Sequence, residues 1–340
     1  MKLISKKNSV INRGRIIRKL KWGVAGCGNF LEKTLLPSLQ QLKRSKLVSV
    51  YSSNLGRATE IAEKYFVKDA FNNFDDFLSS DIDAVYIGSI NSDHYDQVLR
   101  AARAGKHILC EKPMAINSIQ AQEMVDVCRE NNVQLMINYS HKFHPLVLKT
   151  KELIKKGMLG KIISISVSFN IDLPPSQNFR FKKSKSGGGA LWDLGTHMLD
   201  LLGFLGGEIT EIKGFTDNVI YKSEVEDFAN AVIKFEKSGY GQLSVSYNSK
   251  RAFNRVEILG YNGSICIENL IGRKDMPAKL IIDLAGEGRK SFRKRANKQL
   301  HLLRSVQKAF LSGEPLPYSG DDALKNIKLI EELERNVTNV

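Results

Sequence analysis

Residues 21–31 read KWGVAGCGNFL, a short apolar run that leads into two closely spaced glycines. Such a run predicts a buried strand, and residues 31–42 continue with the apolar spacing of a helix. The same alternation of strand and helix patterns continues to about residue 140. It predicts an α/β fold that begins with a doubly wound parallel sheet, a Rossmann domain, whose ligands bind at the carboxyl ends of the strands.

The two glycines belong to the pattern G-x-G-x-x-L. Gly26 permits a tight turn after the strand. Gly28 lets a pyrophosphate approach the backbone at the start of the helix, where Asn29 and Phe30 follow. Leu31 stands where the dinucleotide-binding pattern has its third glycine. The position between strand and helix favours a dinucleotide site, and an ordinary strand–helix turn is the alternative.

The end of the second strand pattern bears on the choice of cofactor. Ser52 and Ser53 stand there, with Arg57 close behind and no acidic residue. A carboxylate at this point would bind the ribose 2′-hydroxyl of NAD and repel the 2′-phosphate of NADP. Hydroxyl donors and a cation suit a phosphate, so the sequence favours NADP over NAD. The alternative is that these residues only begin the next helix, with a serine or Asn54 as its N-cap.

After about residue 159 the pattern changes to alternating apolar and polar residues with short turns, which predicts a mostly antiparallel sheet. One helix pattern, residues 190–202, interrupts it. We therefore expect four parts, namely a basic N-terminal extension (1–20), a dinucleotide-binding Rossmann domain (21–140), a substrate-binding α/β domain with an open, mostly antiparallel sheet (141–320) and a C-terminal helix (321–340).

Composition limits the class of protein. The chain has 340 residues, 42% of them hydrophobic, and a net charge of +15, an ordinary globular balance apart from the charge. It lacks an apolar run long enough to span a membrane, and its four cysteines have no CxxC spacing. We expect reduced thiols, a cytoplasmic location and no membrane partner. The six histidines form no cluster with metal-ligand spacing, so no metal site is expected.

The positive charge is concentrated in residues 1–21 and 289–304, which contain basic residues and no acidic ones. No helix-turn-helix, zinc-finger or RNA-binding pattern accompanies them, so nucleic acid is not an expected partner. A solvated tail and a solvated loop are the simplest interpretation, and an anionic partner is the alternative. Four further cations lie between residues 180 and 185, where they indicate either a solvated loop or an anionic substrate.

Two short segments contain residues suited to proton transfer. Lys112, between Glu111 and Pro113, follows a strand pattern at the edge of the sheet where a nicotinamide would lie. A lysine there can donate a hydrogen bond to a substrate oxygen, and a surface lysine before a turn is the alternative. Asp193 and His197 are four residues apart, which on a helix places both on one face. An aspartate can orient an imidazole for proton transfer, and a buried structural histidine is the alternative.

Taken together, these motifs resemble the Gfo/Idh/MocA oxidoreductases over nearly the whole chain, from about residue 22 to 334. The resemblance also covers Asn91 and His94 after the third strand pattern, Pro145 at the domain junction and residues 319–324 before the last helix. Three positions depart from the family pattern: Leu31, Ile90 in place of a common proline, and Lys142 in place of a common arginine.

The resemblance implies an NAD(P)-dependent dehydrogenase or reductase that acts on a secondary alcohol or ketone of a sugar, an inositol or a nucleotide-activated sugar. It implies that Lys112, Asp193 and His197 are catalytic and contact the substrate together with Lys142. It places Asn91 beside the nicotinamide ribose, with His94, Glu111 and Lys112 in the cofactor site. It also implies a homodimer or homotetramer. A non-catalytic NAD(P)-binding regulator is the alternative, because some members of the family sense the cofactor without turnover.

Overall fold

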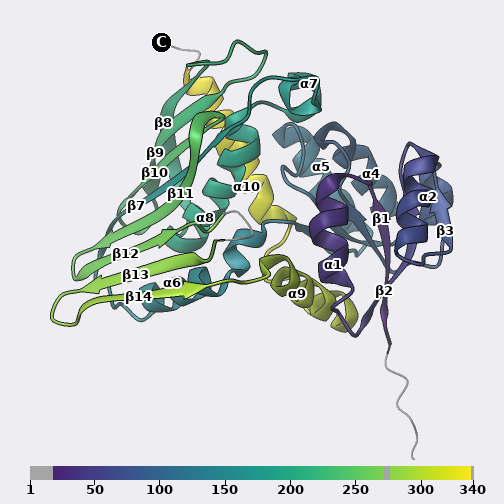
Figure 1. Ribbon diagram of the computed structural model, residues 1–340, viewed down its shortest axis with the longest axis horizontal. Helices are drawn as coiled ribbons and strands as arrows, with labels where there is room; N and C mark the ends of the chain where they lie inside the picture. Colours follow the sequence, from purple (N-terminus) through teal and green to yellow (C-terminus); the bar gives the residue numbers. More distant parts are fainter. Residues whose placement is uncertain (1–17, 272–275, 338–340) are drawn as a thin grey trace, which may run out of the picture.

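The computed structural model describes residues 18–271 and 276–337, so most of the expected basic extension, residues 1–17, lies outside the described residues. Two sheets stand side by side, joined through a layer of helices between them (Figure 1). The expected fold class, a Rossmann sheet followed by an open and mostly antiparallel sheet, is confirmed. None of the described helices is both long and apolar enough to cross a membrane.

The first sheet is parallel throughout and has the order β3-β2-β1-β4-β5-β6. Its strands are β1 (Leu20–Ala25), β2 (Ser45–Tyr51), β3 (Asp69–Phe71), β4 (Ala84–Ile87), β5 (His107–Cys110) and β6 (Leu135–Ile137). Its helices are η1 (Leu31–Leu35), α1 (Leu36–Leu39), α2 (Leu55–Lys64), α3 (Phe74–Leu78), α4 (Asn91–Arg103) and α5 (Ser118–Glu130). The strand order reverses between β1 and β4, and a crevice for ligands opens at such a point.

The second sheet has the order β14-β13-β12-β11-β7-β10-β9-β8, and only β7 and β10 pair in parallel. Its strands are β7 (Ile162–Asp172), β8 (Ile209–Asp217), β9 (Phe228–Phe235), β10 (Tyr240–Ser246), β11 (Asn248–Gly260), β12 (Gly263–Glu268), β13 (Ala278–Leu284) and β14 (Gly288–Lys294). Side chains along β9 alternate between buried and exposed, as expected of a sheet with one covered face.

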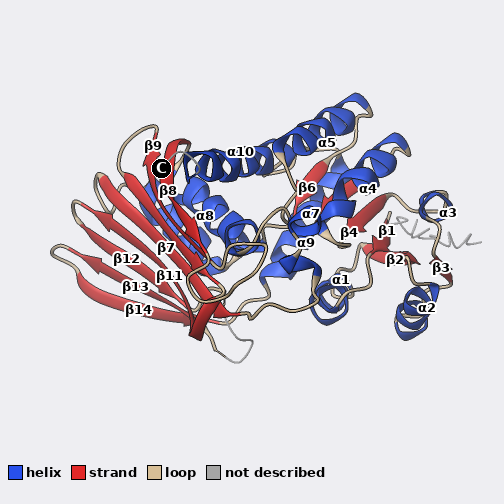
Figure 2. Ribbon diagram, turned by 90° about the horizontal axis from the view of Figure 1, so that it is seen from above, coloured by secondary structure: helices blue, strands red, loops and turns tan. Residues whose placement is uncertain are grey.

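Helices cover the face of this sheet that is turned toward the Rossmann domain (Figure 2). The remaining helical segments are η2 (Ser140–Phe143), α6 (Pro145–Lys155), η3 (Phe179–Phe181), α7 (Lys183–Ser186), η4 (Leu191–Gly195), α8 (Thr196–Gly206), α9 (Lys298–Ser312) and α10 (Gly320–Val337). The first turns of two of the expected helices, η1 and η4, are π-helical, a wider geometry with i→i+5 hydrogen bonds that is frequent at functional sites.

Helix α9 returns to the first domain after the second sheet is complete. Its residues Leu303, Val306 and Phe310 are buried in the same hydrophobic cluster as Trp22 of β1, and the rings of Trp22 and Phe310 are 5.9 Å apart. Its residues fall within the expected 141–320 domain, yet the helix, which was not predicted from the sequence, packs on the Rossmann side. The chain just before it, residues 294–298, therefore runs between the two domains and can contribute to a site there.

Candidate functional site

A cavity of about 1090 Å³ lies between the two domains, at the carboxyl ends of the parallel strands. We call it the interdomain cavity. Both domains contribute to its wall. The glycine loop (residues 26–30) and the ends of β4, β5 and β6 come from the first domain, and η4 and α8 come from the second. The start of α9, which packs on the first domain, also lines it. Of the expected site residues, it is lined by Gly28, Asn29, Phe30, Asn91, His94, Glu111, Lys112, Asp193 and His197.

The glycine loop forms one end of this cavity. Gly26 has a φ of +89°, and a Cβ there would come within 2.5 Å of the backbone of Gly88, so only glycine fits between the two strands. A Cβ on Gly28 would meet nothing within 4 Å. The backbone of Gly28 therefore faces open space at the start of a helix, the space that a pyrophosphate occupies in dinucleotide-binding folds.

The residues at the end of β2 do not line the interdomain cavity. Asn54 caps α2 by accepting a hydrogen bond from the backbone of Arg57, as in the alternative interpretation of this segment. The Arg57 guanidinium is held by Glu32 at 2.5 Å and Glu60 at 2.6 Å, and its Nε donates to the carbonyl of Cys27 in the glycine loop at 3.1 Å. The arginine thus lies beside the loop, with its charge balanced by two carboxylates.

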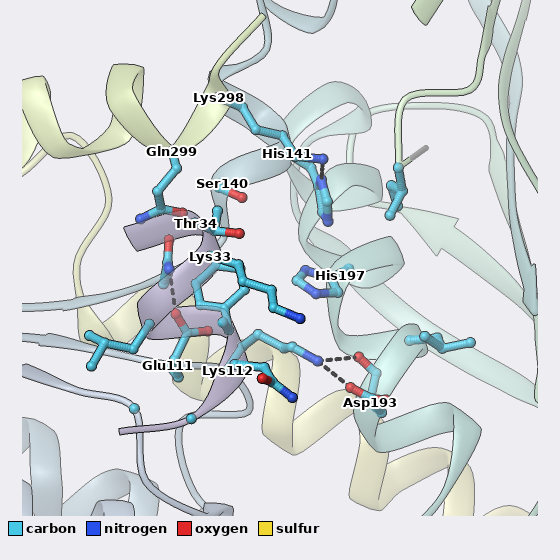
Figure 3. A pocket seen from close by; sticks show the side chains of 18 of the residues that line it. Lys33, Thr34, Glu111, Lys112, Ser140, His141, Asp193, His197, Lys298 and Gln299 are labelled. Carbon is cyan, nitrogen blue, oxygen red and sulfur yellow. Dashed lines mark hydrogen bonds and ion pairs between the residues drawn. The ribbon is translucent and has the colours of Figure 1, made fainter. Parts of the chain in front are cut away.

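Lys112 and Asp193 meet at the centre of the cavity wall (Figure 3). Lys112 follows β5, and its Nζ donates to the Asp193 carboxylate and, at 2.9 Å, to the Asp193 carbonyl. Tyr247 donates its hydroxyl to the other carboxylate oxygen at 2.8 Å, and the Arg180 guanidinium lies 3.4 Å from that oxygen. Burial by itself raises the pKa of Asp193, but the charges of Lys112 and Arg180 and the donated hydrogen bonds outweigh it and hold that pKa well below its usual range.

His197 stands next to this ion pair without bonding to it. Its Nδ1 is buried and makes no hydrogen bond to any residue that the structure describes. The expected contact by which Asp193 orients His197 is therefore absent from the described residues. The Asp193 carboxylate accepts its hydrogen bonds from Lys112 and Tyr247 instead. The π-helical turn of η4 replaces the regular α-helical spacing between the two residues. Burial, and next the Lys112 charge, lower the pKa of His197 well below its ordinary value, so the imidazole is neutral.

Two further cavity residues, His141 and Lys298, had no sequence signal of their own. His141 belongs to η2 and is 6% exposed, and its ring lies 4.4 Å from that of His197. Lys298 begins α9, and its Nζ lies 2.7 Å from Nδ1 of His141 (Figure 3). Burial lowers the pKa of Lys298 to about 7. Tyr247 was missed in the same way, because a tyrosine after a strand has no distinguishing spacing.

Three of the expected cofactor residues form hydrogen bonds within the wall. Asn91 begins α4, and its side chain donates to the carbonyl of Ser186 at 2.9 Å. His94 is fully buried, with a ring nitrogen 2.9 Å from the carbonyl of Pro113, and burial lowers its pKa. Glu111 accepts from the hydroxyl of Tyr86 at 2.8 Å, and burial raises its pKa although this hydrogen bond opposes the shift. The hydrogen bond of Asn91 reaches the second domain, whereas those of His94 and Glu111 stay within the first.

Lys142 does not line the interdomain cavity, in contrast to the substrate contact that the resemblance implied. Its Nζ donates to the Asp200 carboxylate at 2.7 Å, and both side chains are at most 5% exposed. The same ammonium lies 3.8 Å from the ring centroid of Tyr318. The structure thus places this lysine in a buried ion pair that connects η2 to α8.

Several buried polar atoms of the wall have no partner among the described residues. Both amide atoms of Gln299, which is 2% exposed, and the side-chain oxygen of Asn138 make no hydrogen bond there. Buried amide groups in a cavity wall are suited to a polar ligand that offers both donors and acceptors. Together with the open space at Gly28, they fit a dinucleotide. Within residues 18–271 and 276–337, no group of three His, Cys, Asp or Glu side chains is placed to hold a metal ion.

Of the four cations between residues 180 and 185, only Arg180 lines the interdomain cavity. Lys294 and Arg295, from the basic segment 289–304, also line it, from the connection between β14 and α9. The positive charge noted in the sequence therefore partly surrounds the cavity.

Comparison with known proteins gives a consistent result. Residues 20–139 match the family described as an oxidoreductase family with an NAD-binding Rossmann fold, GFO_IDH_MocA, and residues 147–266 match the GFO/IDH/MocA C-terminal domain. Oxidoreductase P35 of Formosa agariphila is 31% identical over 57% of this chain and 63% of its own length. The dTDP-3,4-didehydro-2,6-dideoxy-alpha-D-glucose 3-reductase of Actinomadura kijaniata is 26% identical over 92% of this chain and 94% of its own.

The crystal structure of aldose-aldose oxidoreductase from Caulobacter crescentus, solved with glycerol, resembles this chain with a TM-score of 0.85 and 25% identity. The match covers 94% of this chain and 98% of the other.

Proposed function

Since the chain belongs to the GFO/IDH/MocA oxidoreductase family, we propose that it transfers a hydride between a nicotinamide cofactor and a secondary alcohol or ketone of a sugar, an inositol or a nucleotide-activated sugar. The observation that carries the proposal is the convergence of Lys112, Asp193 and His197 in one cavity that begins at the glycine loop. An ion pair and a neutral imidazole in such a place are the groups that proton transfer to and from a hydroxyl requires.

The nicotinamide, when bound, would supply the hydride donor or acceptor, and the chain's own residues handle the proton. Lys112 donates a hydrogen bond to the reacting oxygen of the substrate and stabilises negative charge on it. Asp193 holds the ammonium of Lys112 in place through its carboxylate and its carbonyl. His197, neutral in the free protein, takes the hydroxyl proton in the oxidation and returns it in the reduction.

The residues that would hold the cofactor extend from the glycine loop to the catalytic lysine. Gly28, Asn29 and Phe30 would bind its phosphates through the backbone, and Asn91 and Glu111 lie at the nicotinamide end.

NADP is the proposed cofactor in preference to NAD. The support is that no acidic residue follows β2, where Ser52 and Ser53 offer hydroxyl donors. Arg57 lies one helical turn further on, held by Glu32 and Glu60. Parallel titrations with NADPH and NADH test this, and at least equal affinity for NADH would contradict it.

We also propose a cytoplasmic homo-oligomer, a dimer or tetramer. The outer face of the second sheet supports an assembly, because its strands expose large apolar side chains, among them Phe215, Val232, Tyr240 and Phe253. Light scattering on the purified protein measures the number of subunits. An anionic group on the substrate is a further proposal, supported by Arg180, Lys294 and Arg295 in the cavity wall.

The test of catalysis compares Lys112→Met with wild type on a panel of sugars, inositols and nucleotide-activated sugars. We expect turnover to fall about 10²- to 10⁴-fold while NAD(P) affinity stays close to that of wild type. Lys161→Met is the matched control, because Lys161 is exposed at the start of the second domain, and it should keep full activity. A fall in cofactor affinity as large as the fall in turnover would remove the assigned role of Lys112.

A further inference from the structure

The wall of the interdomain cavity contains a pair of groups to which the proposed chemistry assigns no role. Lys298 of α9 and His141 of η2 are 157 residues apart in the sequence, yet Nζ of the lysine lies 2.7 Å from Nδ1 of the imidazole. The same Nζ donates to the carbonyl of Leu270 at 3.2 Å. Because Lys298 has two acceptors around it, its position is fixed from both sides.

This contact determines where the imidazole proton resides. A lysine ammonium has three N–H donors and no acceptor, so the ring nitrogen that faces it has to offer a lone pair. When Lys298 is an ammonium, Nδ1 of His141 is therefore the unprotonated nitrogen. A neutral imidazole carries one proton, which leaves it on Nε2.

The groups around His141 keep it neutral. Burial has the largest effect, followed by the positive charge of Lys298. His197 of α8, Lys112 after β5 and His144, which follows η2, also lower the pKa of His141. No carboxylate is among them. The Nε2–H form is thus the one that the described surroundings favour.

Nε2 of His141 is the nitrogen on the side away from Lys298. The imidazole of His141 lines the cavity and packs against His197, with the two rings at 70° to each other (Figure 3). We infer that Lys298 positions His141 in its Nε2–H form, and that His141 donates a hydrogen bond to the substrate oxygen next to the one that His197 and Lys112 contact. This inference rests on the proposed function and narrows it to substrates with oxygens on adjacent carbons, such as vicinal diols and hydroxy ketones.

The contact is expected to depend on pH. Burial lowers the pKa of Lys298 to about 7, so the donor-only ammonium predominates below that pH. Above it, the neutral amine can also accept a hydrogen bond, and the preference of His141 for Nε2–H should weaken. A lysine with a merely structural role would leave the tautomer unchanged over this range.

The first test is nitrogen-15 NMR on the full chain labelled in histidine, which reads the protonation of each ring nitrogen without any assay of activity. The signals of His141 are assigned by their loss in His141→Gln. We expect the Nε2–H form at pH 6 in wild type and in Lys298→Arg, and a mixture of forms in Lys298→Met. An Nδ1–H form in wild type, or unchanged His141 signals in a folded Lys298→Met, would overturn the inference.

The second test measures the substrate contact. A neutral hydrogen bond contributes about 0.5–1.5 kcal/mol, so His141→Leu should lose roughly twofold to twelvefold in kcat/KM with a vicinal diol substrate. His141→Gln keeps an N–H near the place of Nε2 and should recover most of this loss. On a substrate that lacks the neighbouring hydroxyl, His141→Leu and wild type should have the same kcat/KM. If His141→Leu loses as much kcat/KM on this deoxy substrate as on the diol, the proposed contact is wrong.

The two tests separate the inference from the function on which it rests. If wild type is inactive on every substrate offered, the proposed function fails, and the NMR result alone decides whether Lys298 fixes the tautomer. If wild type is active but His141 carries its proton on Nδ1, the function stands and the inference fails.

Discussion

Lys142 offers the sharpest contrast between a role in substrate binding and a role in stability. The resemblance implied a substrate contact, whereas the structure places the lysine in a buried ion pair with Asp200, outside the interdomain cavity. We expect Lys142→Met to lower the free energy of unfolding and to leave KM for the substrate unchanged.

The magnitude follows from the burial of both partners, which are at most 5% exposed. Removing one partner of a buried ion pair typically costs about 3–5 kcal/mol, because the other charge stays uncompensated. Contact of the ammonium with the Tyr318 ring, 3.8 Å away, contributes up to about 2 kcal/mol more. Burial raises the pKa of Asp200 even in the presence of Lys142, so the orphaned carboxyl will take up a proton and limit the loss. About 3 kcal/mol at pH 7 is the expected result.

Urea denaturation followed by tryptophan fluorescence measures the loss, and steady-state kinetics measures KM. The double variant Lys142→Met/Asp200→Leu should recover most of the stability, since replacing a buried pair by apolar residues is often neutral. The difference between Lys142→Met and wild type should also shrink from pH 7 to pH 5. The raised pKa of Asp200 makes its ionisation costly in the folded state, and that cost disappears as the pH falls. A large rise in KM with unchanged stability would refute this reasoning.

Two further predictions concern the glycine loop and acid. Gly28→Ala should fold normally but lose NAD(P) affinity, because its Cβ occupies the open space next to the backbone of residue 28. Gly26→Ala should instead lose stability, because its Cβ collides with the backbone of Gly88. Equal cofactor affinity of Gly28→Ala and wild type in a fluorescence titration would contradict the proposed phosphate site at the glycine loop. Burial lowers the pKa of His197, and lowers that of His144 to about 4, while unfolded histidines titrate near 6.5. Below about pH 6.5 the unfolded chain therefore binds protons that the folded chain does not, and each such histidine should remove up to about 1.4 kcal/mol of stability per pH unit. Thermal denaturation between pH 8 and pH 5 checks this, and a constant Tm would count against buried neutral histidines.

Much of the fold was predictable because its signals are local. Gly26 and Gly28 sit between a strand pattern and a helix pattern, and the turn they form depends on a few consecutive residues. The change from alternating strands and helices to alternating apolar and polar residues likewise identified the second sheet. What patterning could not show is that α9 packs against Trp22 of β1, because an amphipathic helix does not specify which apolar surface will cover it.

The sequence by itself determined the fold class. It singled out Lys112 by its position after a strand, and Asp193 and His197 by their four-residue spacing. Only the tertiary structure decided which of these groups touch. It joined Asp193 to Lys112 and Tyr247, buried Lys142 against Asp200 and brought Lys298 to His141. The physical reason is the sequence separation of the interacting residues. Turns and helices are set by neighbouring residues. A contact such as Lys298–His141, between residues 157 apart, forms only when the hydrophobic cores pack and fix the distance between their surfaces.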